Sequence, residues 1–103
     1  MWEHYVLNEI YGERQGVQMR YWRDKRGREI DFIWARPGKP VVAIECKWST
    51  NNIDGKPFSV FRKSYAEGPN LVVLPYIDKP YTIREQGVDL EIIGLKHLIK
   101  RLG

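Results

Sequence analysis

Apolar residues along the chain fall into short runs, and their spacing predicts alternating helices and strands. Between residues 2 and 13 the apolar side chains recur at helical spacing, which predicts a first helix that ends at Gly12 or Gly16. Polar turns rich in Gly and Pro then separate runs of β-branched and aromatic residues. These runs predict three strands, at residues 18–23, 28–35 and 41–48. Short turns between consecutive strands favour an antiparallel meander.

The second half of the chain predicts a crossover and a small tail. Residues 57–67 carry aromatic side chains at helical spacing, and a buried strand is expected within 70–77. A helix between two strands makes a βαβ crossover, so the strands at 41–48 and 70–77 should be parallel. We expect residues 78–86 to be irregular, 88–93 to form a last edge strand, and 95–102 to form a short helix. The predicted fold class is α/β, a mixed sheet in the order αβββαβ with a short βα tail.

Composition bounds the class of protein. A chain of 103 residues with 43% apolar and 13% aromatic residues is typical of one globular domain. The net charge of +4 is only a weak indication of a nucleic-acid partner. A single cysteine, Cys46, excludes an internal disulfide framework and an all-cysteine zinc site. No apolar run approaches the ~20 residues of a membrane span and no signal-peptide pattern is present, so the cytoplasm is the expected compartment.

Charged residues interrupt two of the predicted strands. Asp31 lies in the strand at 28–35, and Glu45 and Lys47 lie in the strand at 41–48. Because side chains alternate along a strand, Glu45 and Lys47 share one face and their apolar neighbours share the other. Charges on a largely buried strand are costly unless a partner compensates them. A metal-dependent active site would supply that partner.

Paired carboxylates suit a hard divalent cation. Mg²⁺ prefers oxygen ligands and keeps several waters, so two or three acids are sufficient. A neighbouring lysine such as Lys47 can orient or deprotonate a water molecule. Glu9 falls within the apolar stripe of the first helix. Two interpretations of Glu9 stay open, a third acid of the cluster or an ion pair at the edge of the stripe.

The run Glu29-Ile30-Asp31-Phe32 and the tripeptide Glu45-Cys46-Lys47 resemble the motif of the PD-(D/E)xK nuclease superfamily, the restriction-endonuclease-like fold. The resemblance implies that Asp31 and Glu45 bind Mg²⁺, for which Mn²⁺ can substitute, and that Lys47 completes a catalytic set that cuts DNA. Glu9 matches a helical acid that several branches use as a further metal ligand.

Residues 21–32 resemble more closely the C-terminal nuclease-like domain attached to archaeal-type AAA ATPases of unknown function. This resemblance is good from residue 2 to residue 49 and thins afterwards.

The chain departs from the superfamily pattern in two places. Ile30 stands where the superfamily motif has a proline. The helix at 57–67 should carry a further polar residue in branches related to recombination nucleases, and no residue there matches clearly. The residues left without a role are Ser59, Arg62, Lys63 and Tyr65.

Basic residues cluster around the first predicted hairpin. Arg23, Lys25, Arg26 and Arg28 form a solvated turn on the simplest interpretation. Beside a nuclease site they would contact DNA phosphates, which supply most non-specific affinity. The aromatic residues Trp34, Trp48 and Tyr65 are interpreted as core or subunit contacts rather than as base-stacking platforms.

The leading hypothesis is a small Mg²⁺-dependent nuclease domain that hydrolyses DNA phosphodiesters and works as a homodimer. The alternative is a non-catalytic accessory domain that binds nucleic acid or dimerises and belongs to a larger AAA ATPase. No Gly-rich phosphate-binding loop is present, so the ATPase itself is not in this sequence. A helix that begins at residue 2 is what an excised C-terminal domain would show, and a small stand-alone protein could begin in the same way. A third interpretation is a structural domain in which Asp31, Glu45 and Lys47 form ordinary ion pairs.

Overall fold

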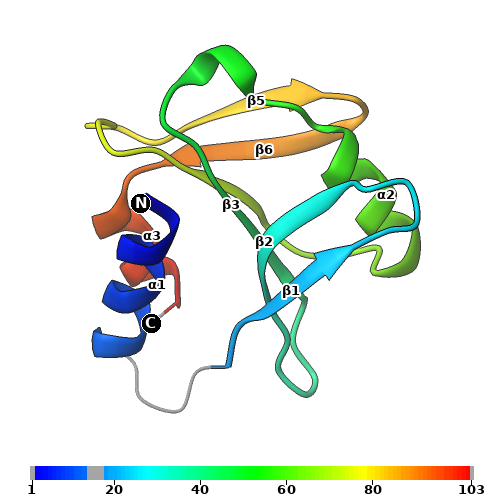
Figure 1. Cartoon of the computed structure of the whole chain (residues 1–103), viewed down its shortest axis with the longest axis horizontal. Helices are drawn as coiled ribbons and strands as arrows, with labels where there is room; N and C mark the ends of the chain where they lie inside the picture. Colours follow the sequence, from blue (N-terminus) through cyan, green and yellow to red (C-terminus); the bar gives the residue numbers. More distant parts are fainter. Residues whose placement is uncertain (1, 14–17, 103) are drawn as a thin grey trace.

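A computed structural model of the chain describes residues 2–13 and 18–102 (Figure 1). Along these residues the elements are α1 (Trp2–Glu13), β1 (Arg20–Arg23), β2 (Glu29–Trp34), β3 (Val42–Cys46), a 3₁₀ turn (Thr50–Asn52), α2 (Lys56–Ser64), β4 (Asn70–Val73), β5 (Tyr81–Glu85), β6 (Val88–Ile93) and α3 (Leu95–Leu102). Gly16, one of the two predicted ends of the first helix, lies outside the described residues. Among the described helices none combines the length and the apolar character needed to cross a bilayer.

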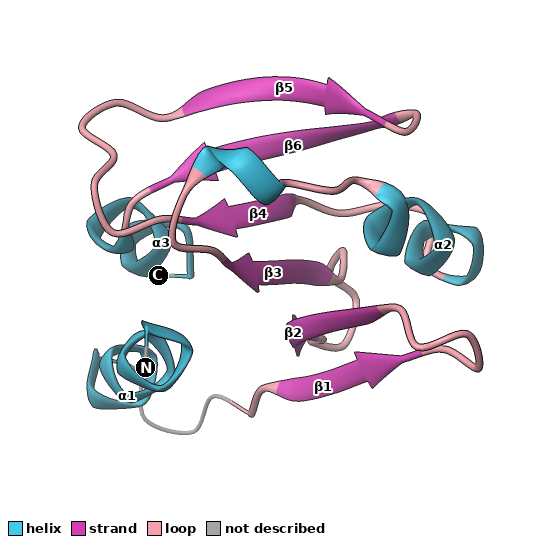
Figure 2. Cartoon of the chain, turned by 45° about the horizontal axis from the view of Figure 1, so that its top comes forward, coloured by secondary structure: helices cyan, strands magenta, loops and turns pink. Residues whose placement is uncertain are grey.

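All six strands belong to one mixed sheet in the order β1-β2-β3-β4-β6-β5 (Figure 2). β1, β2 and β3 form the predicted antiparallel meander. β3, β4 and β6 run parallel, as the βαβ crossover through α2 requires. The predicted meander and crossover are therefore confirmed.

Each face of the sheet carries a separate apolar core. On one face α1 and α3 pack through Val6, Ile10 and Leu98 against side chains of the central strands. On the other face Phe58 and Phe61 of α2 pack against the intervening residues of the same strands. Figure 1 shows α1 and α3 together on one side and α2 on the other. A sheet covered on both faces explains why β3 and β4 are apolar almost throughout.

The tail of the fold differs from the prediction. Residues 81–85 form β5 instead of an irregular segment, and β6 lies between β4 and β5 instead of at the edge. The two strands are joined by Gln86 and Gly87 alone, and both have positive φ (+51° and +80°). Positive φ at both positions is the geometry of a type I′ hairpin, whose usual sequence signal is Asn-Gly or Asp-Gly. Gln86 replaces the usual first residue, so the signal was missed.

Arg62 has a structural role. Its side chain donates five hydrogen bonds of 2.7–3.2 Å, to the side chain of Asn70 and to the backbone oxygens of Val41, Tyr65, Glu67 and Pro69. These acceptors lie in the segment after α2, directly before β3, and at or directly before the start of β4. A side chain at Gly68 would collide with the backbone oxygen of Val41 and crowd Arg62. Arg62 therefore holds the crossover in place.

Candidate functional site

A β-bulge in β2 sets the position of Asp31. Arg20 of β1 lies opposite Ile33, but Trp22 lies opposite Ile30, so β2 has one residue more than β1 over this stretch. Asp31 and Phe32 together face Tyr21. Ile30 and Ile33 consequently both enter the α2 core, which strict alternation would forbid. Bulges of this kind re-aim a side chain and are common beside active sites.

The sheet forks at the bulge. β2 pairs with β3 from Trp34 only as far as Phe32, whereas β3 continues along β4 to Cys46. Beyond the last backbone pairing of β2 with β3, the side chain of Asp31 makes the contact between the two strands. Its Oδ2 accepts a hydrogen bond of 2.8 Å from the backbone N–H of Cys46. The carboxylate of Asp31 is thereby held between the two strands.

The carboxyl group of Glu45 lies within hydrogen-bonding reach of the side chain and the backbone N–H of Asp31. Burial, and then the hydrogen bond and negative charge of Asp31, raise the pKa of Glu45 to about 9, and the charge of Lys47 only partly opposes this. Two carboxyl groups this close cannot both ionise freely. Glu45 therefore keeps its proton at a higher pH than an ordinary glutamate does. The structure brings together Asp31, Glu45 and Lys47, the three residues that the motif singled out.

Glu3, in the first turn of α1, is the helical acid beside this pair. Its pKa is raised by burial and by the charge of Asp31, and the charge of His4 works in the opposite direction. Glu3 lines a hollow of about 200 Å³ together with Cys46 and Lys47. It also lines a second hollow, of about 270 Å³, together with Asp31. Glu3 thus stands between the two depressions that flank the acids.

Glu9 lies elsewhere on the same helix. At about 100° per residue, Glu3 and Glu9 are about 120° apart around the axis of α1. The side near Glu9 carries Trp2 and Tyr5, which face α3 across a hollow that they share with its first residues. Glu9 is half-buried, and it is not among the charges that shift the pKa of Glu3 or Glu45. The structure therefore places Glu3, and not Glu9, beside Asp31.

The apolar stripe of α1 contained a signal for Glu3. Tyr5 fits the helical spacing of apolar residues, but its side chain is 53% exposed. Leu7 instead packs against the core that contains Val6 and Ile10. The stripe formed by Trp2, Val6, Leu7 and Ile10 is centred nearer to Glu3 than to Glu9.

The donor set suits a hard divalent cation. Among the described residues no group of three or more His, Cys, Asp or Glu side chains is arranged to hold a metal ion. Asp31 and Glu45 provide a pair of neighbouring carboxyl groups, and the negative charge of Asp31 is one of the causes that raise the pKa of Glu45. Mg²⁺ binds through one or two protein carboxylates and keeps its remaining waters. The residues present fit such an ion, whose positive charge would replace the proton that Glu45 keeps.

Cys46 lies between the acids but is a poor nucleophile. Burial, and then the charges of Asp31, Glu45 and Glu3, raise the pKa of its thiol far above the usual range. The thiol therefore stays protonated, as expected of a cysteine that packs against the core.

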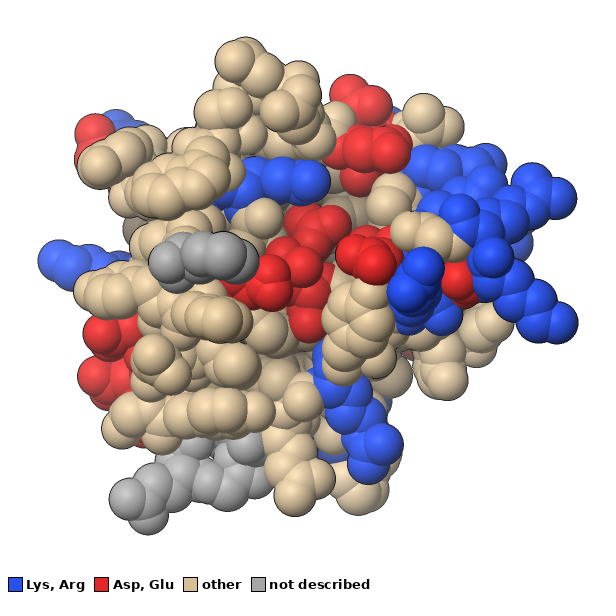
Figure 3. All heavy atoms as spheres, viewed as in Figure 1, with Lys and Arg blue, Asp and Glu red and all other residues tan. Residues whose placement is uncertain are grey.

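The basic hairpin is divided into paired and unpaired side chains. Asp24 accepts backbone N–H groups of Arg26 and Arg28 at 2.9 and 2.8 Å and pairs with the Arg28 guanidinium at 2.9 Å. Arg23 approaches Glu29 at 3.8 Å. Lys25 and Arg26 are exposed at the tip, with no side-chain ion pair to any described residue. Figure 3 shows acidic side chains at the centre of one face and basic side chains along its right edge.

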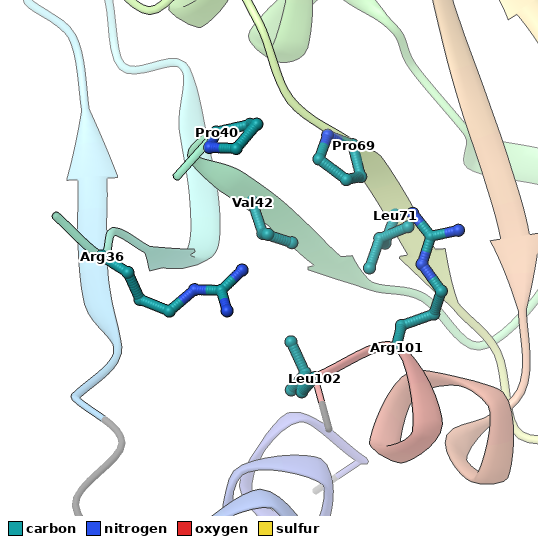
Figure 4. Close-up of a pocket in the computed structure, with 7 residues that line it drawn as sticks. All are labelled: Arg36, Pro40, Val42, Pro69, Leu71, Arg101 and Leu102. Atoms are coloured by element: carbon teal, nitrogen blue, oxygen red, sulfur yellow. The ribbon is translucent and has the colours of Figure 1, made fainter. Parts of the chain in front are cut away.

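A further hollow, of about 130 Å³, lies against the starts of β3 and β4 (Figure 4). Arg36 and Arg101 enter it from opposite sides, and the rest of its lining is apolar. Arg101 is paired with Glu91 at 2.9 Å, and Arg36 stacks on Trp34 with its guanidinium carbon 3.9 Å from the ring centroid. The lining includes no acid, so this hollow lacks the groups for metal-assisted hydrolysis.

The fold and the site define a mixed α/β domain with a carboxyl pair at a fork in its sheet. The chain belongs to the family described as Domain of unknown function (DUF4143), whose model matches residues 1–95. Among curated proteins no match was found.

The fold is similar to that of a solved chain from the tetradecameric assembly of Thermococcus gammatolerans McrB AAA+ hexamers with bound McrC. The similarity has a TM-score of 0.59 at 12% sequence identity, and it covers 90% of this chain. The chain spans only 27% of that protein's length. A likeness at this level of identity concerns the fold.

Proposed function

We propose that this domain is a metal-dependent nuclease that hydrolyses DNA phosphodiesters, with the restriction-endonuclease-like fold. The observation that carries the proposal is the Asp31–Glu45 carboxyl pair, held at the fork between β2 and β3 with Lys47 beside it. The bulge at Asp31 supports a functional origin, because an ordinary strand would pair through to the end and bury an apolar side chain there.

In this proposal each residue has a separate task. Asp31 and Glu45 hold Mg²⁺, or Mn²⁺ in its place, and the ion supplies a Lewis acid and a bound water of lowered pKa. Lys47 orients the attacking water and offsets charge that develops on the phosphate. Glu3 takes the place that the sequence suggested for Glu9, as the third acid that would complete the metal shell or position the attacking water. Lys25 and Arg26 contact the phosphate backbone of DNA.

Metal binding and DNA cleavage test this proposal together. Calorimetric titration with Mn²⁺ should show binding to the wild-type protein, strong loss in Asp31→Asn, and little change in the matched helical variant Glu9→Gln. Cleavage of circular and linear DNA in Mn²⁺ should fall by at least 100-fold in Lys47→Ala with the fold retained by circular dichroism. Wild-type cleavage rates in both Asp31→Asn and Lys47→Ala would refute these roles.

A second function is favoured by the fold likeness to a chain of an AAA+ assembly. On this proposal the domain is a non-catalytic accessory module of an AAA ATPase, in the same chain or complex, and it binds nucleic acid or dimerises in the cytoplasm. It predicts no Mn²⁺ binding that depends on Asp31 and Glu45. Light scattering across a concentration series separates a homodimer from a monomer in either case.

A further inference from the structure

Three aromatic side chains form a continuous row at the surface beside the acids. Trp48 is 67% exposed and Tyr5 is 53% exposed, and Trp2 lies between them. The ring centroids are 6.2 Å apart for Trp48 and Trp2 and 5.8 Å apart for Trp2 and Tyr5. We call Trp48, Trp2 and Tyr5 the aromatic row.

The aromatic row is fixed to the sheet through its central member. The indole N–H of Trp2 donates a hydrogen bond of 3.1 Å to the backbone oxygen of Val73 in β4. Trp48 follows Lys47 directly along the chain as it leaves β3, and it rests on Trp2. The outer ring of the row is therefore held on a fixed support, which reduces the entropy lost when a ligand stacks on it.

Charged side chains bound the aromatic row at both ends. Lys47 and Glu3 line the hollow at the Trp48 end, and Lys96 and Asp78 line the hollow at the Tyr5 end. A flat apolar protein surface laid across the row would bury these charges without partners, which is costly. A nucleic-acid strand presents flat bases alternating with charged phosphates, so its bases can cover the rings while its phosphates approach the lysines.

We propose that the aromatic row binds unpaired bases of a nucleic-acid strand, and that the domain therefore prefers substrates with single-stranded segments. The faces of a base inside a duplex are covered by its neighbours, so only an unpaired base can lie flat on Trp48. The Trp48 end of the row shares a hollow with Lys47 and Glu3, and Glu3 lines a second hollow together with Asp31. A strand stacked on the row would therefore lead toward the acids. The preference for substrates with single-stranded segments rests on the proposed nuclease function, and it deepens that function by naming the substrate class.

Binding measured without divalent cations tests the aromatic row independently of cleavage. The probe is a fluorescent 15-nucleotide oligo-dT in EDTA, and the competitor is covalently closed circular duplex DNA. Trp48→Ala should weaken oligo-dT binding roughly tenfold and leave duplex binding within about twofold, because base stacking and not a phosphate contact is lost. Tyr65→Ala, which removes another exposed aromatic ring at the end of α2, should change neither affinity.

The possible outcomes separate this inference from the nuclease proposal. Oligo-dT binding that depends on Trp48 supports the aromatic row even when no cleavage is found with Mn²⁺. If DNA is cleaved but the wild type and Trp48→Ala bind oligo-dT equally well, the proposed role of the aromatic row is refuted and the nuclease proposal is retained. Light scattering that shows a dimer lost in Trp48→Ala overturns the inference as well, because the row would then be covered by a second copy of the chain.

Discussion

Replacing Glu45 by glutamine should stabilise the folded domain at neutral and alkaline pH. Glutamine has the shape of a protonated glutamate, so its oxygen can still accept the backbone N–H of Asp31 and its amide can donate to the Asp31 carboxylate. The substitution removes a carboxyl group that folding holds protonated. Stability is thus gained where function would be lost, as is common at sites selected for activity.

The sign and size of this effect follow from the pKa of Glu45. Folding raises that pKa from 4.5 to about 9, so between these values the folded state binds more protons than the unfolded state. The contribution of Glu45 to the free energy of unfolding is therefore complete below pH 4.5. It is lost as the pH rises toward 9, by at most about 1.4 kcal/mol per pH unit. Because the pair keeps partial contact with water, we expect Glu45→Gln to gain about 2 kcal/mol at pH 8 and almost nothing at pH 4.5.

Urea unfolding of the wild type and of Glu45→Gln at pH 5, 6.5 and 8 measures this gain. Mg²⁺ at ten times its dissociation constant should raise the free energy of unfolding of the wild type by about 1.4 kcal/mol at pH 8. The same addition should not stabilise Glu45→Gln. A stability difference that does not change between pH 5 and pH 8 would show that Glu45 is not held protonated by burial and Asp31.

Other predictions concern the remaining parts of the molecule. Binding of Mn²⁺ should strengthen as the pH rises from 6 to 8 and should release up to one proton per ion, which calorimetry in two buffers of different ionisation enthalpy detects. Arg62→Ala should lower the free energy of unfolding by about 3–4 kcal/mol, and Arg62→Lys by somewhat less, because a lysine cannot reach all five acceptors. Lys25→Ala combined with Arg26→Ala should lower the affinity for single-stranded and duplex DNA alike, in contrast to Trp48→Ala. The double substitution should also reduce the salt dependence of binding by about two phosphate contacts.

Local patterns predicted the elements whose signals are contained in a few consecutive residues. The helix at 2–13, the meander and the crossover follow from periodicity and turn residues, and the structure confirms them. The hairpin of β5 and β6 was missed because Gln86 is an unusual residue for its turn. The edge position of β5 could not be read locally, because strand order depends on pairing between distant segments.

Trp48 shows why an aromatic residue cannot be assigned to a core from its type alone. The alternation along β3 placed Trp48 on the face of Val42 and Ile44, which are buried. β3 ends at Cys46, so the alternation no longer holds at Trp48 and its ring emerges beside Trp2. The interpretation of Trp48 as a core or subunit contact is therefore corrected with respect to the core, because its side chain is mostly exposed.

The sequence by itself determined that Asp31, Glu45 and Lys47 are exceptional, because charges within apolar strands are costly and ask for a partner. Only the tertiary structure decided how they meet. The extra residue in β2 is visible only against β1, and it directs Asp31 into the gap where β2 leaves β3. The direction in which α1 lies across the sheet then brings Glu3, and not Glu9, to the same place, because the packing of Val6 and Ile10 fixes the rotation of the helix.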